Sequence, residues 1–384
     1  MNKFFKTLFS IFLIFLFETS NSYTDETKIK IGVLVPLSGE NASLGKQIIN
    51  SIRMALIDIN NDKIEVYPKD TKSDPNLTLR SALEFEQMGI SLVIGPVFYK
   101  NLSYLDKVKN VTFLSLTNKT LDLHKNIISS GINSTSQLNT IKKFLEKNEI
   151  KKTIFLIPNS NYELEVKKGV KKSKIKFYKQ YNYDVDPTKL TKQIEKITRY
   201  GIRKQNLIDE ITRVKNSDDP NKEKILEKLE KKYTLGNLKF DSVVIADFDE
   251  SLKSVITSLL YTDVSPKDKY IITLNQWFDE SLLDETNSQP IYYPSINKKN
   301  LDEFNNKFFK KFNYKPNYLS LLSYDLLGLI YFLSLKNETL ELSKSFKTQN
   351  IFKGKIGVFE IKDNKINHQL NFYEISNGKL KEIF

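Results

Sequence analysis

The stretch that decides the fold is IKIGVLVPLSGENASLGK, which occupies residues 29–46. Its first part is apolar at nearly every position, as in a strand of a parallel sheet that is buried on both faces. A glycine-bearing turn and a lysine follow, which raises the question of a phosphate-binding loop. That loop reads G-x-x-x-x-G-K-[ST], whereas Gly39 and Gly45 have five residues between them and Gln47 follows Lys46. The spacing argues against a nucleotide site.

Strands and helices alternate along the chain on both sides of residue 136. In the first half, a helix with an apolar stripe is expected to follow the opening strand. Asp74 and Pro75 have the residue types of a helix cap and first position, and Gly89 those of a helix end. Further strands are predicted at KIEVY (63–67), SLVIG (91–95), VTFLSL (111–116) and NIISSG (126–131).

After a helix predicted at 136–148, the same alternation begins again. The segments predicted here are strands at 152–158, 174–181, 240–246 and 269–274 and helices at 161–170 and 248–260. Strand–helix alternation at this spacing is typical of doubly wound parallel sheets. We therefore predict an α/β fold of two doubly wound lobes, with further helices at 299–313 and 317–335 and strands at 354–361 and 368–376.

The predicted domain organisation follows from this order of elements. It comprises a signal segment at 1–22, a first lobe at 28–135 plus 292–350, a second lobe at 136–291 plus 351–384, and a helical-hairpin insertion at 187–237. The insertion is predicted because apolar residues recur at helical steps on both sides of the turn NSDDP (216–220).

The N-terminus has the pattern of an export signal. Lys3 and Lys6 precede an apolar run at 8–17, and small residues at 20 and 22 come just before Tyr23. The run is about half of the roughly 20 residues that span a bilayer, and the segment 321–335, which polar residues interrupt, is not expected to span either. We expect cleavage near Tyr23 and a periplasmic protein; an uncleaved anchor is the alternative. Without cysteine the chain cannot carry a lipoprotein anchor.

The formal net charge of +13 admits two explanations. A basic balance can reflect binding to nucleic acid or to an anionic envelope surface. However, Lys, Asn, Ile, Phe and Tyr are enriched together, as an AT-rich genome produces. We favour the compositional explanation and predict no nucleic-acid site.

Residues for catalysis or metal binding are sparse. The chain has two histidines, no cysteine and none of the common hydrolase or dinucleotide motifs. Asp247, Asp249 and Glu250 form an acidic cluster that could perform acid–base chemistry or bind a metal. It could equally cap the helix that follows, which we favour. No catalytic residue, metal site or cofactor is predicted, and an enzyme is not expected.

Four segments resemble the type I periplasmic binding proteins, which include the leucine/isoleucine/valine-binding family. They are IGVLVPLSGENASLGKQIINSIRMALIDIN (31–60), DTKSDP (70–75), LVIGPVF (92–98) and FLSLTN (113–118). The resemblance implies two α/β lobes joined by three crossing strands, with a ligand held in the cleft between them. The turn at Ser38 and Gly39 would then face that cleft, as ligand sites do at the carboxyl ends of strands.

A narrower resemblance concerns residues 234–266 and 301–325 together with the helical insertion. These segments look like the penicillin-binding-protein-activator branch, similar to the C-terminal domain of LpoA. The resemblance implies a regulator whose partner is a membrane-bound peptidoglycan synthase. The alternative is the solute receptor of an ABC importer for amino acids, with an ABC permease as partner. The chain lacks the lipoprotein cysteine and the long N-terminal helical region of the enterobacterial members.

The resemblance also implies a set of residues for a small ligand in the cleft. They are Ser38, Gly39, Gly95, Pro96, Ser115, Thr117 and Asn118 on the first lobe, and Tyr162 and Trp277 on the second. The positions where amino-acid binders carry small hydroxyl residues are occupied here by the bulky stretch 98–100. Trp277 could line the cleft or pack at the hinge. The insertion is predicted to be a partner-binding arm with a basic face that includes Lys192, Arg203, Lys204 and Arg213. The alternative is a family-specific element that lies on the lobe and stabilises it.

Overall fold

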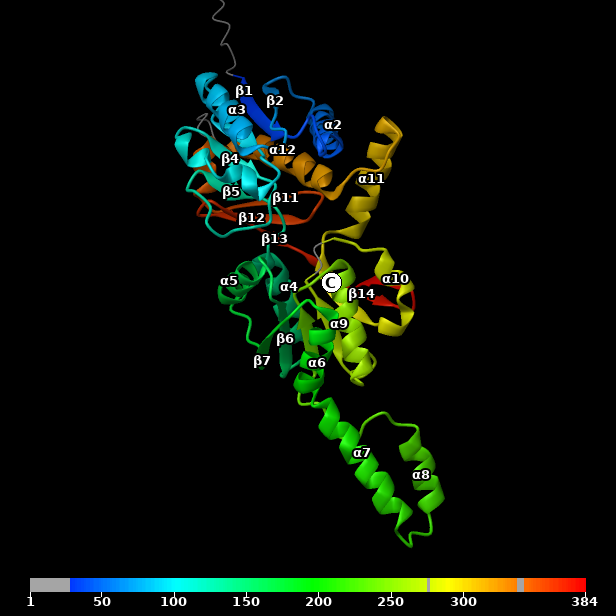
Figure 1. Cartoon of the computed structure of the whole chain (residues 1–384). Helices are drawn as coiled ribbons and strands as arrows, with labels where there is room; N and C mark the ends of the chain where they lie inside the picture. The colour runs from blue at the N-terminus through cyan, green and yellow to red at the C-terminus, as the bar shows by residue number, and fades with distance from the viewer. Residues whose placement is uncertain (1–27, 275–276, 337–341) are drawn as a thin grey trace, which may run out of the picture.

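The protein forms two α/β lobes, one above the other, and a helical arm that projects from the lower lobe (Figure 1). The structure is a computed structural model and describes residues 28–274, 277–336 and 342–384. The predicted signal segment, 1–22, lies outside the described residues.

The first lobe is built on a parallel sheet with the strand order β2-β1-β3-β4-β5. Its strands are β1 Ile29–Val35, β2 Ile64–Asp70, β3 Leu92–Ile94, β4 Thr112–Ser115 and β5 Ile127–Ser129, and its helices are α2 Ala42–Ile59, α3 Pro75–Gln87, α11 Lys298–Phe312 and α12 Tyr318–Lys336. The Asp74 carboxylate accepts hydrogen bonds from the first turn of α3, and Pro75 begins that helix, as predicted. The order is that of a doubly wound fold.

The second lobe repeats this order. Its parallel strands run β7-β6-β8-β9-β10, and antiparallel β14 and β15 extend the sheet beyond β10. The strands are β6 Thr153–Pro158, β7 Lys179–Tyr183, β8 Ser242–Ile245, β9 Tyr270–Thr273, β10 Ile291–Ser295, β14 Asn371–Ser376 and β15 Lys379–Glu382. The helices are α4 Ser134–Lys147, α5 Glu163–Ser173, α6 Pro187–Thr198, α9 Asp249–Tyr261 and α10 Ser281–Asp284. The predicted fold class is confirmed.

A small antiparallel sheet lies between the lobes and packs on α12 (Figure 1). It consists of β11 Asn350–Lys353, β12 Val358–Lys362 and β13 Lys365–Gln369. The buried Asp325 of α12 accepts hydrogen bonds from the main chain of Lys355 (2.8 Å) and Ile356 (2.7 Å), which fixes the sheet to the helix.

The observed strand pairing differs from the predicted lobe boundaries. β10 belongs to the second lobe, although 292–350 was assigned to the first, because its backbone pairs with β9 and β14. The single strand predicted at 368–376 is two strands in different sheets, which separate at Leu370. Neither difference is visible in local hydrophobic pattern, since both depend on pairing between distant segments.

Helix α12 is the one helix in the described ranges that is long and apolar enough to cross a membrane by length and composition. From its interrupting polar residues, the segment 321–335 was not expected to be long and apolar enough to span a bilayer. In the structure its central leucines are buried against α2, and the Ser51 hydroxyl of α2 donates to the Ser320 main-chain oxygen. The helix is thus a core element of the first lobe.

The predicted insertion divides into two parts with different surroundings. Helix α6 packs against α9 and buries Leu190 and Ile194 in the second lobe. Helices α7 Tyr200–Lys215 and α8 Lys222–Glu230 form an antiparallel hairpin that stands away from the lobe (Figure 1). We call this hairpin, residues 200–235, the arm. The predicted boundary at 187 is therefore too early, because α6 supplies core residues.

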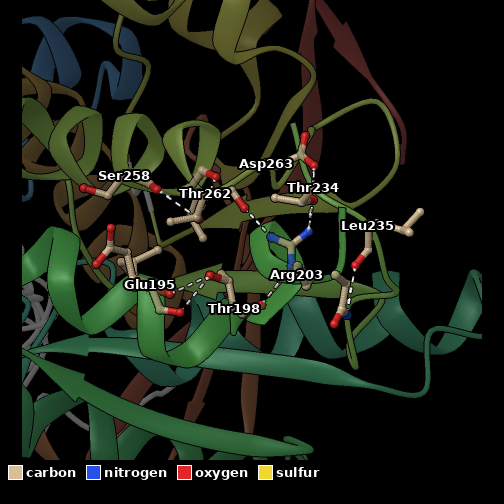
Figure 2. A network of polar contacts seen from close by, with 11 residues as sticks. Glu195, Thr198, Arg203, Thr234, Leu235, Ser258, Thr262 and Asp263 are labelled. Atoms are coloured by element: carbon tan, nitrogen blue, oxygen red, sulfur yellow. Dashed lines mark hydrogen bonds and ion pairs between the residues drawn. The ribbon is translucent and has the colours of Figure 1, made fainter. Parts of the chain in front are cut away.

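The arm has a small core of its own and is attached to the lobe through Arg203 (Figure 2). The guanidinium of Arg203 donates to the main-chain oxygen of Thr198 (3.1 Å), to the Thr234 hydroxyl (3.0 Å) and to the main-chain oxygen of Thr262. Burial lowers the pKa of Arg203, while the nearby Asp263 opposes that shift. Arg203 was predicted on an exposed basic face; the structure shows it buried.

Candidate ligand cleft

Each lobe has one point where the strand order reverses, which is where doubly wound sheets hold ligands. In the first lobe this point lies between β1 and β3, so the turns at Ser38 and Gly95 flank it. In the second lobe it lies between β6 and β8, so Tyr162 and Phe248 flank it. The predicted residues therefore gather at the carboxyl ends of the two sheets.

The turn after β1 is held by a carboxylate of the protein itself. Asp70, at the end of β2, accepts hydrogen bonds from the main chain of Leu37 (2.7 Å) and Ser38 (3.3 Å) and from the Ser38 hydroxyl (2.5 Å). Burial opposes ionisation of Asp70, but hydrogen bonds from Ser38, Lys72 and Leu37 outweigh it and hold the pKa below its usual range. An internal anion thus occupies the donors of a turn that superficially resembles a phosphate loop.

The two glycines of this turn have different roles. Gly39 is exposed and has a φ of 77°, a left-handed conformation that favours glycine. Gly45, in the first turns of α2, lies against Pro36, where an added Cβ would stand 1.8 Å from the Pro36 carbonyl oxygen. Gly45 is therefore required for helix–turn packing.

The hydroxyls predicted to bind a ligand are largely used within the first lobe. Ser115 is fully buried and donates to the main-chain oxygen of Pro96 (2.9 Å). Thr117 is 8% exposed, and its hydroxyl accepts from the main chain of Lys119 (3.2 Å). Asn118 is half-buried in the same loop. The buried Gly95 has a φ of 106°.

Two aromatic contacts mark the corresponding edge of the second lobe. Tyr162 and Phe248 meet edge to face with 5.8 Å between ring centroids, and burial raises the pKa of Tyr162. Trp277 stacks on Tyr318 of α12 with 4.7 Å between centroids. Since α12 belongs to the first lobe, Trp277 forms a packing contact between the lobes, which corresponds to the packing alternative for this residue.

The acidic cluster after β8 does not assemble a metal site or a side-chain cap. Asp247 is buried and accepts a hydrogen bond from the Tyr183 hydroxyl (2.6 Å), and burial raises its pKa. Asp249 and Glu250 lie in the first turn of α9, where their charge favours the helix dipole. Within the described part of the chain, no group of three or more histidine, aspartate or glutamate residues is placed to hold a metal ion.

A buried carboxylate connects the two lobes close to Tyr162. Glu165 of α5 accepts hydrogen bonds from the main chain of Thr120 (2.9 Å) and Leu121 (3.0 Å) and from the Thr120 hydroxyl. The Lys168 ammonium donates to the Thr120 main-chain oxygen. We call these four hydrogen bonds the inter-lobe latch.

The fold, with its two lobes and paired strand ends, is that of the type I periplasmic binding proteins. Residues 28–202 match the family model described as periplasmic binding protein. An uncharacterized protein of Methanocaldococcus jannaschii is 28% identical over 153 residues, which are 38% of this chain and 33% of that protein. The match thus spans about a third of the length of that curated relative.

Solved structures with this fold include both transport receptors and a regulator. LivJ of Streptococcus pneumoniae, in complex with isoleucine, is 18% identical, with a TM-score of 0.53, covering 92% of this chain and 98% of that one. The LpoA C-domain of Haemophilus influenzae, described as a regulator of PBP1A, is 14% identical, with a TM-score of 0.61 and coverages of 92% and 100%. A leucine-bound substrate-binding protein of Desulfitobacterium hafniense is 13% identical, with a TM-score of 0.61 and coverages of 93% and 100%. At these identities the likeness establishes the fold alone.

Sequence reasoning missed the residues that support the cleft from behind. Asp70 begins the segment 70–75, Phe248 lies in the acidic cluster after β8, and Glu165 lies in the helix predicted at 161–170. The partners of all three residues are remote in sequence. The position of Asp70 and Phe248 directly at the carboxyl ends of strands was the available signal. Nothing in the sequence indicated that Glu165, on a helix with many lysines, would be buried.

Proposed function

We propose that the chain is an exported, non-enzymatic binding protein that regulates a membrane-bound peptidoglycan synthase and contacts it through the arm. The observation that carries this proposal is a helical hairpin that has its own core and stands off a lobe whose sheet and covering helices are complete without it. A projecting element that the lobe does not need for packing is suited to a partner.

The exposed residues of the arm indicate what kind of contact it makes. Ile202, Ile208 and Tyr233 are 52%, 49% and 79% exposed. Aromatic and aliphatic side chains of this kind anchor protein interfaces. Of the basic face expected from the sequence, Lys192 and Lys204 are exposed, whereas Arg203 is buried and Arg213 pairs with Glu210 at 2.7 Å. The proposed contact is therefore apolar with mixed charge around it.

The cleft supports the same choice. Two hydroxyl groups expected to bind an amino acid at the strand ends already donate their proton within the lobe, Ser38 to Asp70 and Ser115 to Pro96, and cannot donate to a ligand carboxylate as well. A receptor for free amino acids is therefore less well supported than a regulator. That a domain of this fold is described as a regulator of PBP1A in Haemophilus influenzae agrees with this function.

Removing most of the arm tests the proposal. The Leu235 amide donates to the Arg203 carbonyl oxygen at 2.9 Å, so the two ends of the arm are adjacent and a short Gly/Ser linker can replace residues 207–232. This variant keeps the Arg203 contacts with the lobe. We expect a melting temperature close to that of the full chain and loss of retention by purified, detergent-solubilised peptidoglycan synthase.

Point variants provide the matched control. Replacing Ile208 and Tyr233 with serine should weaken retention, whereas Leu164→Ser, at a residue of α5 that is 68% exposed, should not. Retention of the synthase by the arm-deleted chain would contradict the proposal.

The second candidate is the solute receptor of an ABC importer. It is favoured by the aromatic pair Tyr162–Phe248 at the switch point of the second lobe, where Phe248 is 36% exposed. Calorimetry against the standard amino acids distinguishes the two functions. Binding that Phe248→Ala abolishes, in a chain whose arm is dispensable, would favour the receptor.

A further inference from the structure

A cavity lies beside the crossings between the lobes, next to the carboxyl ends of β4 and β5. It has a volume of about 850 Å³ and is lined by residues of both lobes and of the small sheet. Such a volume is within the range of small-molecule sites. The first lobe contributes the loop after β4 and strand β5, the second lobe contributes α4 and α5, and β13 closes the cavity.

The lining of this cavity is strongly basic. Its cationic residues are Lys125, Lys168, Lys172, Lys347 and Lys365, and its one acidic residue is Asp363. The buried Glu165 lies nearby, but its carboxylate is occupied by the inter-lobe latch. The cavity therefore carries a clear excess of positive charge.

The ammonium groups are close enough to repel one another. Partial burial lowers the pKa of Lys172, and the charges of Lys168 and Lys365 lower it further, while the charge of Glu165 opposes the shift. Lys168 and Lys172 belong to the second lobe, whereas Lys365 is on the small sheet that packs on the first lobe. Strand β13 also contacts α4 of the second lobe, so an anion among these lysines would lie between residues of both lobes and relieve the repulsion of their charges.

Polar side chains complete the lining. Thr135, Asn139 and Asn367 supply hydroxyl and amide groups to the cavity, whereas the hydroxyls of Thr120 and Ser129 already donate to Glu165 and to the Thr117 main-chain oxygen. Lysine ammonium groups bind phosphate as point charges, and hydroxyl and amide groups can bond the remaining oxygens. The lining thus fits a small phosphorylated compound better than an apolar one.

We propose that this cavity, the hinge cavity, is a binding site for a small phosphorylated anion that bridges the two lobes. The anion neutralises the lysines that face each other across the lobe boundary and strengthens the contact that the latch already makes. The site does not depend on the arm.

Inorganic pyrophosphate is a suitable probe. We expect calorimetry at low salt to detect its binding, and Lys172→Gln with Lys365→Gln to weaken the affinity by at least about tenfold, since two charge-assisted contacts are lost. Neither substitution touches the latch. The control is Lys224→Gln with Lys228→Gln on α8, which removes the same net charge far from the cavity. Equal loss in the control, or unchanged affinity in the cavity variant, would overturn the proposal.

The bridging role has its own readout. Because the chain has no cysteine, spin labels can be attached to a single pair introduced by Asp62→Cys and Lys176→Cys, one on each lobe. Pyrophosphate should narrow the distance distribution in the otherwise unchanged chain and not in the Lys172→Gln, Lys365→Gln chain. Bound pyrophosphate without any change in distance would refute bridging.

The phosphate could come from a soluble compound or from a lipid headgroup. Sedimentation with phosphatidylglycerol vesicles separates these sources. Co-sedimentation that requires Lys172 and Lys365 would assign the site to a headgroup, and pyrophosphate binding without co-sedimentation would assign it to a soluble compound.

Discussion

Glu165 and Thr120, which lie on different lobes, are joined by two hydrogen bonds, one from the Thr120 main chain (2.9 Å) and one from its hydroxyl. Glu165 is buried, and hydrogen bonds to a carboxylate are stronger than those to a neutral amide. We therefore expect Glu165→Gln to lower the free energy of unfolding by about 1.5–3 kcal/mol. Urea titration measures the stability, and small-angle scattering should show a larger radius of gyration as the lobes separate.

The matched control for this prediction is Glu163→Gln, two residues earlier on α5. Glu163 pairs with Lys167 on the surface, so its loss should change stability by no more than about 0.5 kcal/mol. An equal effect of the two variants would mean that Glu165 contributes nothing as a latch.

Asp325 predicts a pH dependence of stability. Burial raises its pKa to about 7 from 3.8, against the hydrogen bonds from Ile356 and Lys355. The native state therefore binds the proton more tightly than the unfolded chain. The stabilisation from this group is complete below the unfolded pKa and is lost as the pH rises through about 7.

Asp325→Asn isolates this contribution. Between about pH 4 and pH 8, the stability of the parent chain should fall relative to the variant, by at most about 1.4 kcal/mol per pH unit. His368 acts in the opposite direction, since burial lowers its pKa to about 4 and its contribution is lost as the pH falls. Both chains retain His368, so it cancels in the difference. Parallel pH profiles would contradict the prediction.

Arg203→Lys should weaken the attachment of the arm to the second lobe without unfolding the lobe. Lysine cannot reproduce the planar fork that reaches Thr198, Thr234 and Thr262. We expect a loss of about 2–3 kcal/mol, since hydrogen bonds to a buried charged group are broken, and faster tryptic cleavage confined to residues 200–235. Arg213→Lys, at an exposed pair, should leave both measurements nearly unchanged.

Gly45→Ala tests the packing of the turn after β1. The new methyl group would lie 1.8 Å from the Pro36 carbonyl oxygen, so α2 or the turn must move. Overpacking of this kind costs about 1–3 kcal/mol or more. Gly201→Ala in the arm meets no atom within 4 Å and should be neutral or stabilising by up to about 1 kcal/mol. Differential scanning calorimetry of both variants makes the comparison.

Much of the fold could be predicted because apolar runs and helix-capping residues mark its strands and helices locally in the sequence. The run at 29–35 had to be a buried strand, and Asp74 with Pro75 had to begin a helix. The observed order β2-β1-β3-β4-β5 is one of the common orders of the doubly wound class that this alternation predicts. The same alternation of strands and helices recurs after residue 136, so both lobes could be predicted.

The remainder depends on pairings that local pattern does not encode. Arg203 looked like one more surface charge, because its partners Thr234 and Thr262 are far away in sequence. Ser115 looked like a free hydroxyl, because its acceptor on Pro96 belongs to another strand end. In both cases the sequence shows which polar group is present but does not show that the side chain is buried and already hydrogen-bonded.

The crossings between the lobes are tied to one another, and this has a mechanical consequence. The Asn133 amide donates to the Ile366 carbonyl oxygen (3.1 Å), and the Tyr373 hydroxyl donates to that of Ile296 (2.9 Å). The first bond joins the segment between β5 and α4 to β13, and the second joins the segment between β10 and α11 to β14. These two segments are therefore tied to the strands on either side of the third crossing, at Leu370. Sliding or twisting of one lobe over the other would break these bonds, whereas rotation about a line through the joined segments preserves them. We therefore expect the two lobes to move relative to one another mainly by this single hinge rotation.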